Sequence, residues 1–261
     1  MILTSLIYIT LLGTSAVVLT TRYYDRALLW KLTREDGPVE WLTVLALVAL
    51  SVLLVSRLRK QGNQYPFKVK VPGYALALLS LLAAGEEISW GQRIFGFQTS
   101  DAMKKINYQH ETNLHNLIPG ELFNGLIIFS VGIFMILLPM VWRRKNPSAW
   151  WLPSEELSYL TLAVICVNHY RVGSLPEKIG LGVLGLILLW GTLQSLRLKK
   201  PKPLAACLTA WLTCGVLFTF RKLLPAANQQ YEIRELLVIL LVTRYCMEVF
   251  DNIKKAPAEN G

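Results

Sequence analysis

The sequence has 261 residues, of which 53% are apolar and only 17% are charged, and its mean hydropathy is +0.41. This composition is too apolar for an ordinary soluble domain of the same length. The formal net charge is +10, but the Lys and Arg residues form short clusters between apolar runs. That distribution argues against a nucleic-acid-binding surface and is typical of a polytopic membrane protein.

Apolar segments recur along the whole chain. They predict an all-α transmembrane bundle of about eight spans in a single integral membrane domain, residues 1–261. The expected spans are residues 2–20, 39–56, 73–90, 122–142, 157–170, 179–196, 204–220 and 236–250, of which the fifth is the shortest. The first segment lacks a basic leader and a small-residue cleavage site, so we expect it to be retained. Gly180, Gly182 and Gly185 lie in the sixth, where close helix packing is the expected use.

The basic clusters set the expected orientation. Lys and Arg residues follow the second, fourth, sixth and eighth segments, and all these positions fall on one side of an eight-span bundle. The loops 57–70, 143–145 and 197–202 contain no Asp or Glu, whereas basic residues on the opposite side are interleaved with carboxylates. By the positive-inside rule the basic side is cytoplasmic, which predicts that both termini lie in the cytoplasm.

Four polar clusters are then expected to lie together on the extracytoplasmic side. They are residues 34–41, 86–115, 168–171 and 229–235, and they include all three histidines of the chain, His110, His115 and His169. The spans between them are largely Leu, Ile, Val and Ala. The polar side chains therefore gather at one face instead of lining a path across the bilayer.

Two adjacent carboxylates, Glu86 and Glu87, come directly after the apolar run 74–83. An ionisable residue at membrane depth costs about 2.5–3.5 kcal/mol on insertion scales, so this pair suggests a functional site. On a continuous helix Glu86, Trp90 and Arg93 share one face, which allows a structural ion pair covered by the indole. Glu87 points away from that face and is expected to act as a base or a ligand.

The residues around this pair predict a change in backbone structure. Gly85 and Gly91 either admit close helix packing or let the helix unwind. Residues 94–107 are too polar to span the bilayer and too apolar for a free loop. They predict an interfacial or re-entrant segment near residues 94–116.

The histidines that follow do not have the spacing of a zinc protease. His110 and His115 are five residues apart, whereas the His-Glu-x-x-His helix places its histidines four apart. Glu111 and His115 are four apart and can share one helical face as a ligand pair, or as a base and its orienting group. His110 projects away from His115 on a regular helix, so both reach one metal only if a helix begins between them.

An acidic cluster near the start of the second span has two explanations. Glu35, Asp36 and Glu40 can supply oxygen ligands to a hard cation. A turn followed by a helix start at Pro38 explains the same residues as capping and helix-dipole partners.

Basic residues near the histidines suggest an anion site. Arg171 and Arg93 can hold an anionic head group with bidentate hydrogen bonds, although an interfacial arginine also snorkels without a specific ligand. Arg244 and Glu248 have the spacing of a structural ion pair on a helix. The four cysteines all fall in apolar segments and are expected to be small buried hydrophobic residues.

The string Gly85-Glu86-Glu87-Ile88-Ser89-Trp90-Gly91-Gln92-Arg93, with Glu35-Asp36-Gly37 before it and Asn113-Leu114-His115-Asn116 after it, resembles a group of uncharacterised bacterial polytopic inner-membrane proteins. The resemblance covers mainly the first half of the chain and implies no activity. The CAAX-type intramembrane proteases carry Glu-Glu-x-x-x-Arg, and the interval from Glu86 to Arg93 is two residues too long for that motif. Alkaline ceramidase-like hydrolases carry a His-x-x-x-His pair that the sequence lacks.

The leading hypothesis is a membrane-embedded enzyme that carries out metal-dependent hydrolysis or group transfer on a lipid or lipid-linked substrate. The expected catalytic residues are Glu86, Glu87, His110 and His169. The expected substrate-binding residues are Trp90, Arg93, Asn113 and Arg171. The expected ligands of a divalent metal, zinc or manganese, are Glu40, Glu87, Glu111 and His115. The alternatives are an ion- or proton-coupled transporter and a non-catalytic membrane assembly subunit.

Overall fold

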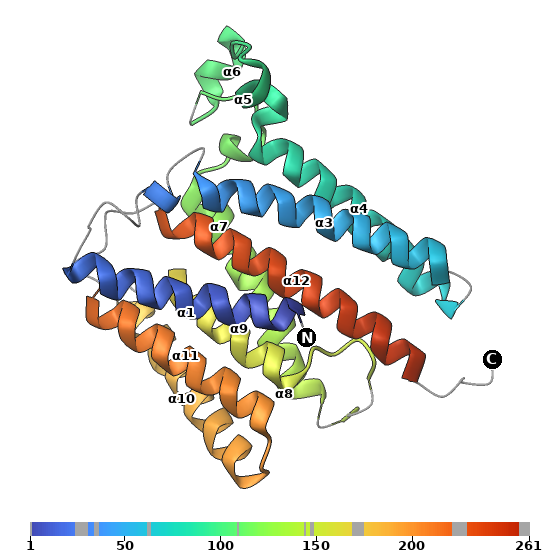
Figure 1. Cartoon of the computed structure of the whole chain (residues 1–261), viewed down its shortest axis with the longest axis vertical. Coiled ribbons are helices and arrows are strands. Elements are labelled where there is room, and N and C mark those ends of the chain that lie inside the picture. The colour runs from blue at the N-terminus through green and yellow to red at the C-terminus, as the bar shows by residue number, and fades with distance from the viewer. Residues whose placement is uncertain are drawn as a thin grey trace. The chain divides into compact units, whose positions relative to one another are not determined.

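The computed structural model describes residues 2–23, 31–33, 37–61, 64–108, 110–143, 145–146, 149–168, 175–220 and 229–255. Over these residues the chain is helical and contains no strand, which confirms the all-α fold class (Figure 1). The contacts divide the chain into two compact units. We call Glu40–Ser130 the middle unit, and Met1–Val39 together with Val131–Gly261 the terminal unit.

The middle unit consists of long helices and a series of short ones. In chain order they are α3 (Pro38–Gln61), α4 (Phe67–Glu87), η2 (Ser89–Gly91), α5 (Gln92–Phe95), α6 (Asp101–Ile106), η3 (His115–Leu117) and α7 (Gly120–Gly132). A buried stripe on α3 includes Leu47, Leu50, Leu54 and Leu58, at the spacing of one helical face. Leu58 also packs on Gly73 of α4, where a Cβ would lie 2.8 Å from its side chain.

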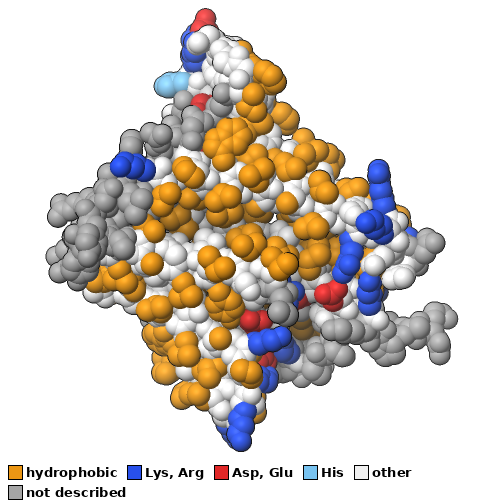
Figure 2. Space-filling model, in the orientation of Figure 1, with side chains coloured by type: hydrophobic (Ala, Val, Ile, Leu, Met, Phe, Trp, Pro, Cys, Tyr) orange, Lys and Arg blue, Asp and Glu red, His pale blue; other side chains and the backbone are white. Residues whose placement is uncertain are grey.

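Helix α4 separates a basic turn from the polar segment that follows it. Its 21 residues extend over about 31 Å, which matches a hydrocarbon core of about 30 Å. Arg59 and Lys60 end α3, and Lys68 and Lys70 lie in the first turns of α4. Figure 2 shows basic side chains gathered at the α3–α4 turn and apolar side chains along the two helices, while α5 and α6 lie beyond the other end of α4 (Figure 1).

The terminal unit is organised around α9 (Glu155–Asn168), the fifth expected span. Every residue from 157 to 167 is buried, because α9 is packed against α1 (Ile2–Tyr23), α10 (Leu175–Arg197), α11 (Pro201–Phe220) and α12 (Gln229–Lys255). A helix that is apolar on all sides is expected at such a position. With 14 residues it is about 21 Å long, which is shorter than the bilayer core.

The fourth expected span is one helical run with a widened turn. It passes from α7 through a π-helical turn, η4 (Ile133–Leu137), into α8 (Leu138–Trp142). Pro139 lies in the first turn of α8. Proline lacks a backbone N–H and its ring clashes with the carbonyl four residues earlier, so the preceding turn widens.

Six helices among the described residues are long and apolar enough to cross a membrane. They are α1, α3, α4, the run from α7 to α8, α10 and α11. The other two expected spans correspond to α9, which is short, and α12, whose apolar residues are interrupted by charged ones. These helices fit a multi-pass membrane protein, and the count of eight spans stays a prediction.

An ion pair within α12 confirms one structural expectation. Arg244 Nη2 lies 2.9 Å from Glu248 Oε1, and Arg244 Nε donates to Thr4 Oγ1 at 2.8 Å. Glu248 also accepts hydrogen bonds from the backbone N–H and the hydroxyl of Ser154, at 3.0 and 2.8 Å. The pair therefore links α12 to α1 and to the start of α9. The cysteines are free, and all but the half-buried Cys214 are buried, as expected.

Candidate functional site

Three consecutive residues after α4 have a left-handed backbone. The φ angles are 47° at Ser89, 56° at Trp90 and 87° at Gly91. A residue with a side chain loses roughly 1–2 kcal/mol in this conformation, and such strained positions concentrate at functional sites. The helix expected over residues 73–90 therefore ends three residues earlier, at Glu87. The expected helical face shared by Glu86, Trp90 and Arg93 does not form.

The reversal folds the indole of Trp90 back over the last turn of α4. A Cβ at Gly85 would lie 3.1 Å from the Trp90 ring, so a glycine there lets the ring approach closely. The indole Nε1 donates to Glu86 Oε1 at 2.5 Å. Of the two expected uses of the glycines, the unwinding of the helix is present at Gly91. At Gly85 the close contact is with the Trp90 side chain and not with another helix.

Glu86 is the centre of the cluster. Its second oxygen, Oε2, accepts the backbone N–H of Leu114 at 2.6 Å and that of His115 at 3.0 Å. The same oxygen lies 3.4 Å from His115 Nδ1. The side chain of Glu86 keeps 16% of its surface exposed and that of His115 keeps 29%. We call these two residues the Glu86–His115 pair.

A buried network lies beside this pair. Glu111 Oε2 accepts the hydroxyl of Ser89 at 2.8 Å and the side-chain amide of Asn113 at 2.8 Å. Asn107 donates to the side-chain and backbone oxygens of Asn113 at 2.9 and 2.8 Å. Ser89, Asn107 and Asn113 are almost completely buried, and a buried network whose members are satisfied holds its elements rigidly.

A third set of contacts joins the same two segments. Gln92 Nε2 donates to Thr99 Oγ1 at 2.8 Å, and Gln92 Oε1 accepts the backbone N–H of Thr112 at 2.8 Å. We call residues 88–99 and 107–117 the loop pair. Side chains from one loop satisfy the backbone of the other, so the position of His115 depends on the whole loop pair.

The short helix α6 between the two loops is locally specified. Ser100 caps it by accepting the backbone N–H of Met103 at 3.3 Å. Asp101 lies in its first turn, and Lys104 and Lys105 lie in its last, as the helix dipole favours. Residues 94–116 thus fold as short helices and loops, and their depth in a membrane stays a prediction.

His110 is turned toward α6. It has a left-handed backbone, with a φ of 58°, and its side chain is exposed. Its Nδ1 lies 2.7 Å from the backbone oxygen of Lys104, and because a carbonyl only accepts hydrogen bonds, Nδ1 is the donor. The catalytic role expected for His110 stays a prediction.

The expected helical pairing of Glu111 and His115 is wrong. Residues 110–114 form bends rather than a helix, and His115 begins η3. Glu111 contacts Ser89 and Asn113, whereas His115 contacts Glu86. The side chains of Asn107 and Gln92 take the backbone N–H groups of Glu111 and Thr112, which a helix would have directed to carbonyl groups.

Two further expected site residues lie on the long helices of the middle unit, and three lie partly or wholly outside what the structure describes. Glu87 is the half-buried last residue of α4, and Glu40 is buried in the first turn of α3. Arg93 lies in α5, and its side chain lies outside what the structure describes. His169 and Arg171 lie outside the described residues altogether, as do Glu35 and Asp36.

The expected metal site is untested. Over the described part of the chain, no three side chains of His, Cys, Asp or Glu are grouped so that they could hold an ion. The zinc or manganese site expected at Glu40, Glu87, Glu111 and His115 therefore stays a prediction.

Sequence reasoning missed several residues that hold the loop pair together. They are Ser89, Gln92, Thr99, Asn107 and Thr112. Ser, Thr and Asn side chains readily bond to nearby backbone groups and favour turns over helices. Ser89, Gln92 and Thr99 lie close in the sequence to Gly91 and Gly96, which have a left-handed backbone. This concentration of polar residues and glycines could have predicted a loop in place of a continued helix.

Comparisons of the chain with protein-family models, with curated proteins and with solved structures found no match. The chemistry of the site is therefore argued from its own contacts. The resemblance of residues 85–93 to bacterial inner-membrane proteins stays a prediction.

Proposed function

We propose that the Glu86–His115 pair is the reactive centre of a membrane enzyme that hydrolyses, or transfers a group on, a lipid or lipid-linked substrate. The observation that carries this proposal is the 3.4 Å approach of His115 Nδ1 to Glu86 Oε2. An imidazole backed by a carboxylate is the arrangement of an acid-base catalyst. At 3.4 Å the contact is an ion-pair distance, and such contacts often tighten when substrate binds.

The pair supplies a base and then an acid. The carboxylate of Glu86 favours the tautomer in which His115 carries its proton on Nδ1, so that Nε2 is the basic atom. Nε2 takes a proton from water or from an acceptor hydroxyl, whose oxygen attacks the carbonyl carbon or phosphorus of the substrate. The imidazolium, stabilised by Glu86, then returns that proton to the leaving oxygen as its bond breaks.

The position of the pair suits a substrate anchored in the bilayer. Glu86 lies at the end of α4, about 24–27 Å along the helix from Lys70 and Lys68. Leu78, Leu79 and other large apolar side chains of α4 are exposed, as lipid-facing positions require. The positive-inside rule assigns the basic end to the cytoplasm. The site would then face the outside of a bacterial inner membrane, with both termini in the cytoplasm.

The other expected residues have supporting roles in this proposal. Trp90 and Asn113 position Glu86 and the loop pair through the hydrogen bonds already described. Arg93 holds anionic oxygens of the substrate, and Glu87 assists proton transfer. The roles expected for His169 and Arg171 stay predictions.

A divalent metal remains part of the proposal. A carboxylate behind a histidine also orients histidine ligands in metal sites. If Nε2 of His115 held zinc or manganese, it would no longer be the base, and the metal would supply the activation of the attacking water. Elemental mass spectrometry of purified wild-type protein and of His115→Ala tests this. We expect near-stoichiometric metal that is lost in the variant. Metal-free wild-type protein, after zinc and manganese have been supplied, would leave acid-base catalysis without a metal.

The test of the function is turnover of lipids by reconstituted protein. Wild-type protein, His115→Gln and Tyr108→Phe are placed in vesicles of bacterial phospholipids supplemented with lipid-linked phosphates and sugars, and the products are identified by mass spectrometry. Tyr108 is the matched control, because it lies in the same loop and its side chain is exposed. Loss of a general acid-base group lowers the rate by about 10²- to 10⁴-fold. We expect that loss for His115→Gln alone; products that are equal in all three samples, or absent from the wild type, would contradict the proposal.

A further inference from the structure

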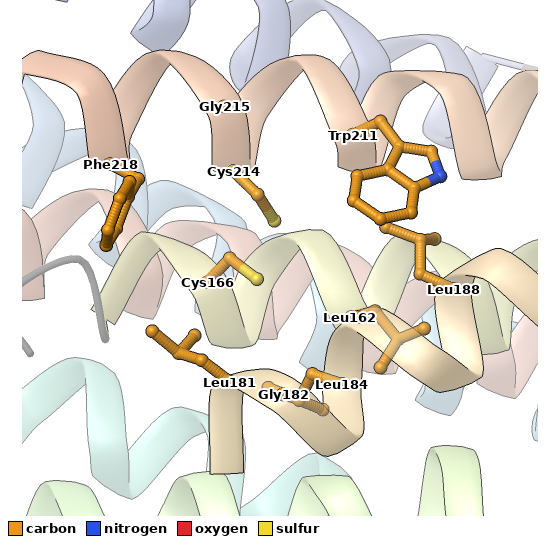
Figure 3. Close-up of a pocket in the computed structure, with 11 residues that line it drawn as sticks. Leu162, Cys166, Leu181, Gly182, Leu184, Leu188, Trp211, Cys214, Gly215 and Phe218 are labelled. Carbon is orange, nitrogen blue, oxygen red and sulfur yellow. The ribbon is translucent and has the colours of Figure 1, made fainter. Parts of the chain in front are cut away.

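The terminal unit contains a cavity of about 370 Å³ between α9, α10 and α11 (Figure 3). It belongs to the terminal unit alone and involves neither Glu86 nor His115. Ligand cavities in proteins are about 300–1,000 Å³, so this one is large enough for a small ligand or part of a larger one.

Helix α10 forms one wall through a stripe of residues with helical spacing. Leu181, Leu184, Gly185 and Leu188 recur at intervals of three and four and line the cavity together with Gly182. A Cβ at Gly182 or Gly185 would meet no heavy atom within 4 Å. Among the described residues no helix packs closely on these two glycines, and the missing side chains leave the wall hollow.

Helix α11 forms the opposite wall with the same spacing. Trp211, Cys214, Gly215 and Phe218 line the cavity, and a Cβ at Gly215 would again meet no heavy atom within 4 Å. The thiols of Cys214 and of Cys166 on α9 also line the cavity (Figure 3). The two glycine-containing stripes and the buried face of α9 enclose the space.

The described side chains around the cavity offer little to a polar ligand. The indole Nε1 of Trp211 donates to Thr192 Oγ1 at 3.2 Å, and the thiols of Cys166 and Cys214 are only weak hydrogen-bonding groups. The other lining side chains are Leu, Phe and Gly. A buried water needs about two to four polar partners, and apolar cavities that lack them stay dry or take an apolar ligand.

The cavity is short compared with a membrane span. The stripe from Leu181 to Leu188 covers roughly 10 Å of helix length, and a volume of about 370 Å³ lies near the lower end of the range for ligand cavities. A partner helix that crosses the membrane is about 30 Å long and would leave most of its length outside the cavity, whereas part of one hydrocarbon chain can lie within it.

The membrane around α10 and α11 contains narrow apolar molecules, the hydrocarbon chains of its lipids. Both α10 and α11 are long and apolar enough to cross a membrane, so the cavity lies along the hydrocarbon phase. Trp211 and Phe218 are 41% and 47% exposed, which places the rim of the cavity at the protein surface. A hydrocarbon chain that enters recovers dispersion contacts that an empty cavity forfeits.

We propose that this cavity binds one hydrocarbon chain of a membrane phospholipid. The three glycines Gly182, Gly185 and Gly215 make the groove that receives the chain, and Trp211 and Phe218 flank its entrance. The site is distinct from the proposed catalytic centre, and it stands whether or not the Glu86–His115 pair is catalytic.

The test uses a substitution on α10 that fills the cavity with a side chain. Gly185→Phe places a ring where a Cβ meets no atom, and Gly180→Phe adds the same ring five residues earlier, at a glycine that is equally unobstructed but does not line the cavity. Each protein is reconstituted in phosphatidylcholine vesicles containing a trace of phosphatidylcholine with a diazirine in its acyl chain. After irradiation, labelled residues are mapped by peptide mass spectrometry, with the exposed Leu186 and Leu193 as internal references.

We expect the wild type and Gly180→Phe to be labelled at the cavity residues of α10 and α11 well above the references. Gly185→Phe should lose that labelling about tenfold while the references are unchanged. Gly215→Leu fills the cavity from α11 and should show the same loss of labelling at the cavity residues. It replaces Gly185→Phe as the test variant if Gly185→Phe does not fold. Equal labelling of cavity and reference residues in the wild type would overturn the proposal. So would undiminished cavity labelling in either folded cavity variant.

Discussion

His115 is held twice by one oxygen of Glu86, through its imidazole Nδ1 at 3.4 Å and through its own backbone N–H at 3.0 Å. The backbone contact does not depend on the protonation state of the imidazole. Glu86 therefore stays in place while the ring gains or loses a proton, which an acid-base cycle requires. The indole of Trp90 donates a hydrogen bond to the other carboxylate oxygen. Both oxygens of Glu86 are therefore held by contacts other than that with the imidazole of His115.

Replacement of Asn113 should weaken the middle unit. Its side chain contacts Ser89, Glu111 and Asn107, so Asn113→Ala leaves buried polar groups with lost partners, each at a cost of about 1–3 kcal/mol. We expect a clear fall in the thermal unfolding temperature in detergent. Leu114→Ala is the control, because Leu114 is exposed and its backbone contact survives. An equal response of the two variants would show that the network does not stabilise the loops.

Gly91→Ala should strain the turn that brings Trp90 over α4. The φ of 87° at Gly91 disfavours a side chain by about 1–2 kcal/mol, and a Cβ there would lie 3.1 Å from the Phe95 ring. The control is Gly125→Ala in α7, where a Cβ meets no atom within 4 Å and helix propensity improves by about 0.5–1 kcal/mol. The unfolding temperatures should shift in opposite directions, and a neutral Gly91→Ala would argue against the left-handed turn.

A second glycine pair tests the packing of α10. A Cβ at Gly191 would lie only 2.4 Å from the Tyr159 ring on α9, whereas a Cβ at Gly180 would meet nothing within 4 Å. Overpacking of this kind costs about 1–3 kcal/mol, so Gly191→Ala should unfold at a lower temperature than the wild type. Gly180→Ala should unfold at the same temperature or higher. If Gly191→Ala were as stable as Gly180→Ala, the close contact of α10 and α9 would be wrong.

The sequence predicted the positions of the long helices well, because apolar runs and helix-start signals such as Pro38 are local. It could not show that α9 is enclosed by other helices. The residues of α9 are as apolar as those of a span, and their apolar surface is buried against neighbouring helices of the terminal unit. The number of helices packed around α9 is a property of tertiary structure, and the expected crossing of the membrane by α9 stays a prediction.

The site was predicted by residue type but not by pairing. Glu86 and His115 were both expected to be functional, but each was assigned a neighbour on its own helix. Both assignments assumed regular helices, and the left-handed residues Ser89 and Trp90 break that assumption. Contacts across the loop pair, from Glu111 to Ser89 for example, outweigh local helix propensity there and cannot be read from spacing.

The most direct test of the central claim is a double-mutant cycle on turnover of the lipid identified in vesicles, with Glu86→Gln, His115→Gln and the double variant. Gln at position 86 keeps one oxygen that can accept the backbone N–H groups of Leu114 and His115, so the change removes the charge together with the hydrogen bond from the Trp90 indole. Residues that act as one catalytic unit show non-additive losses. The account predicts that the double variant is no slower than His115→Gln alone. If the two single losses instead multiplied in the double variant, Glu86 and His115 would act independently and the account would be contradicted.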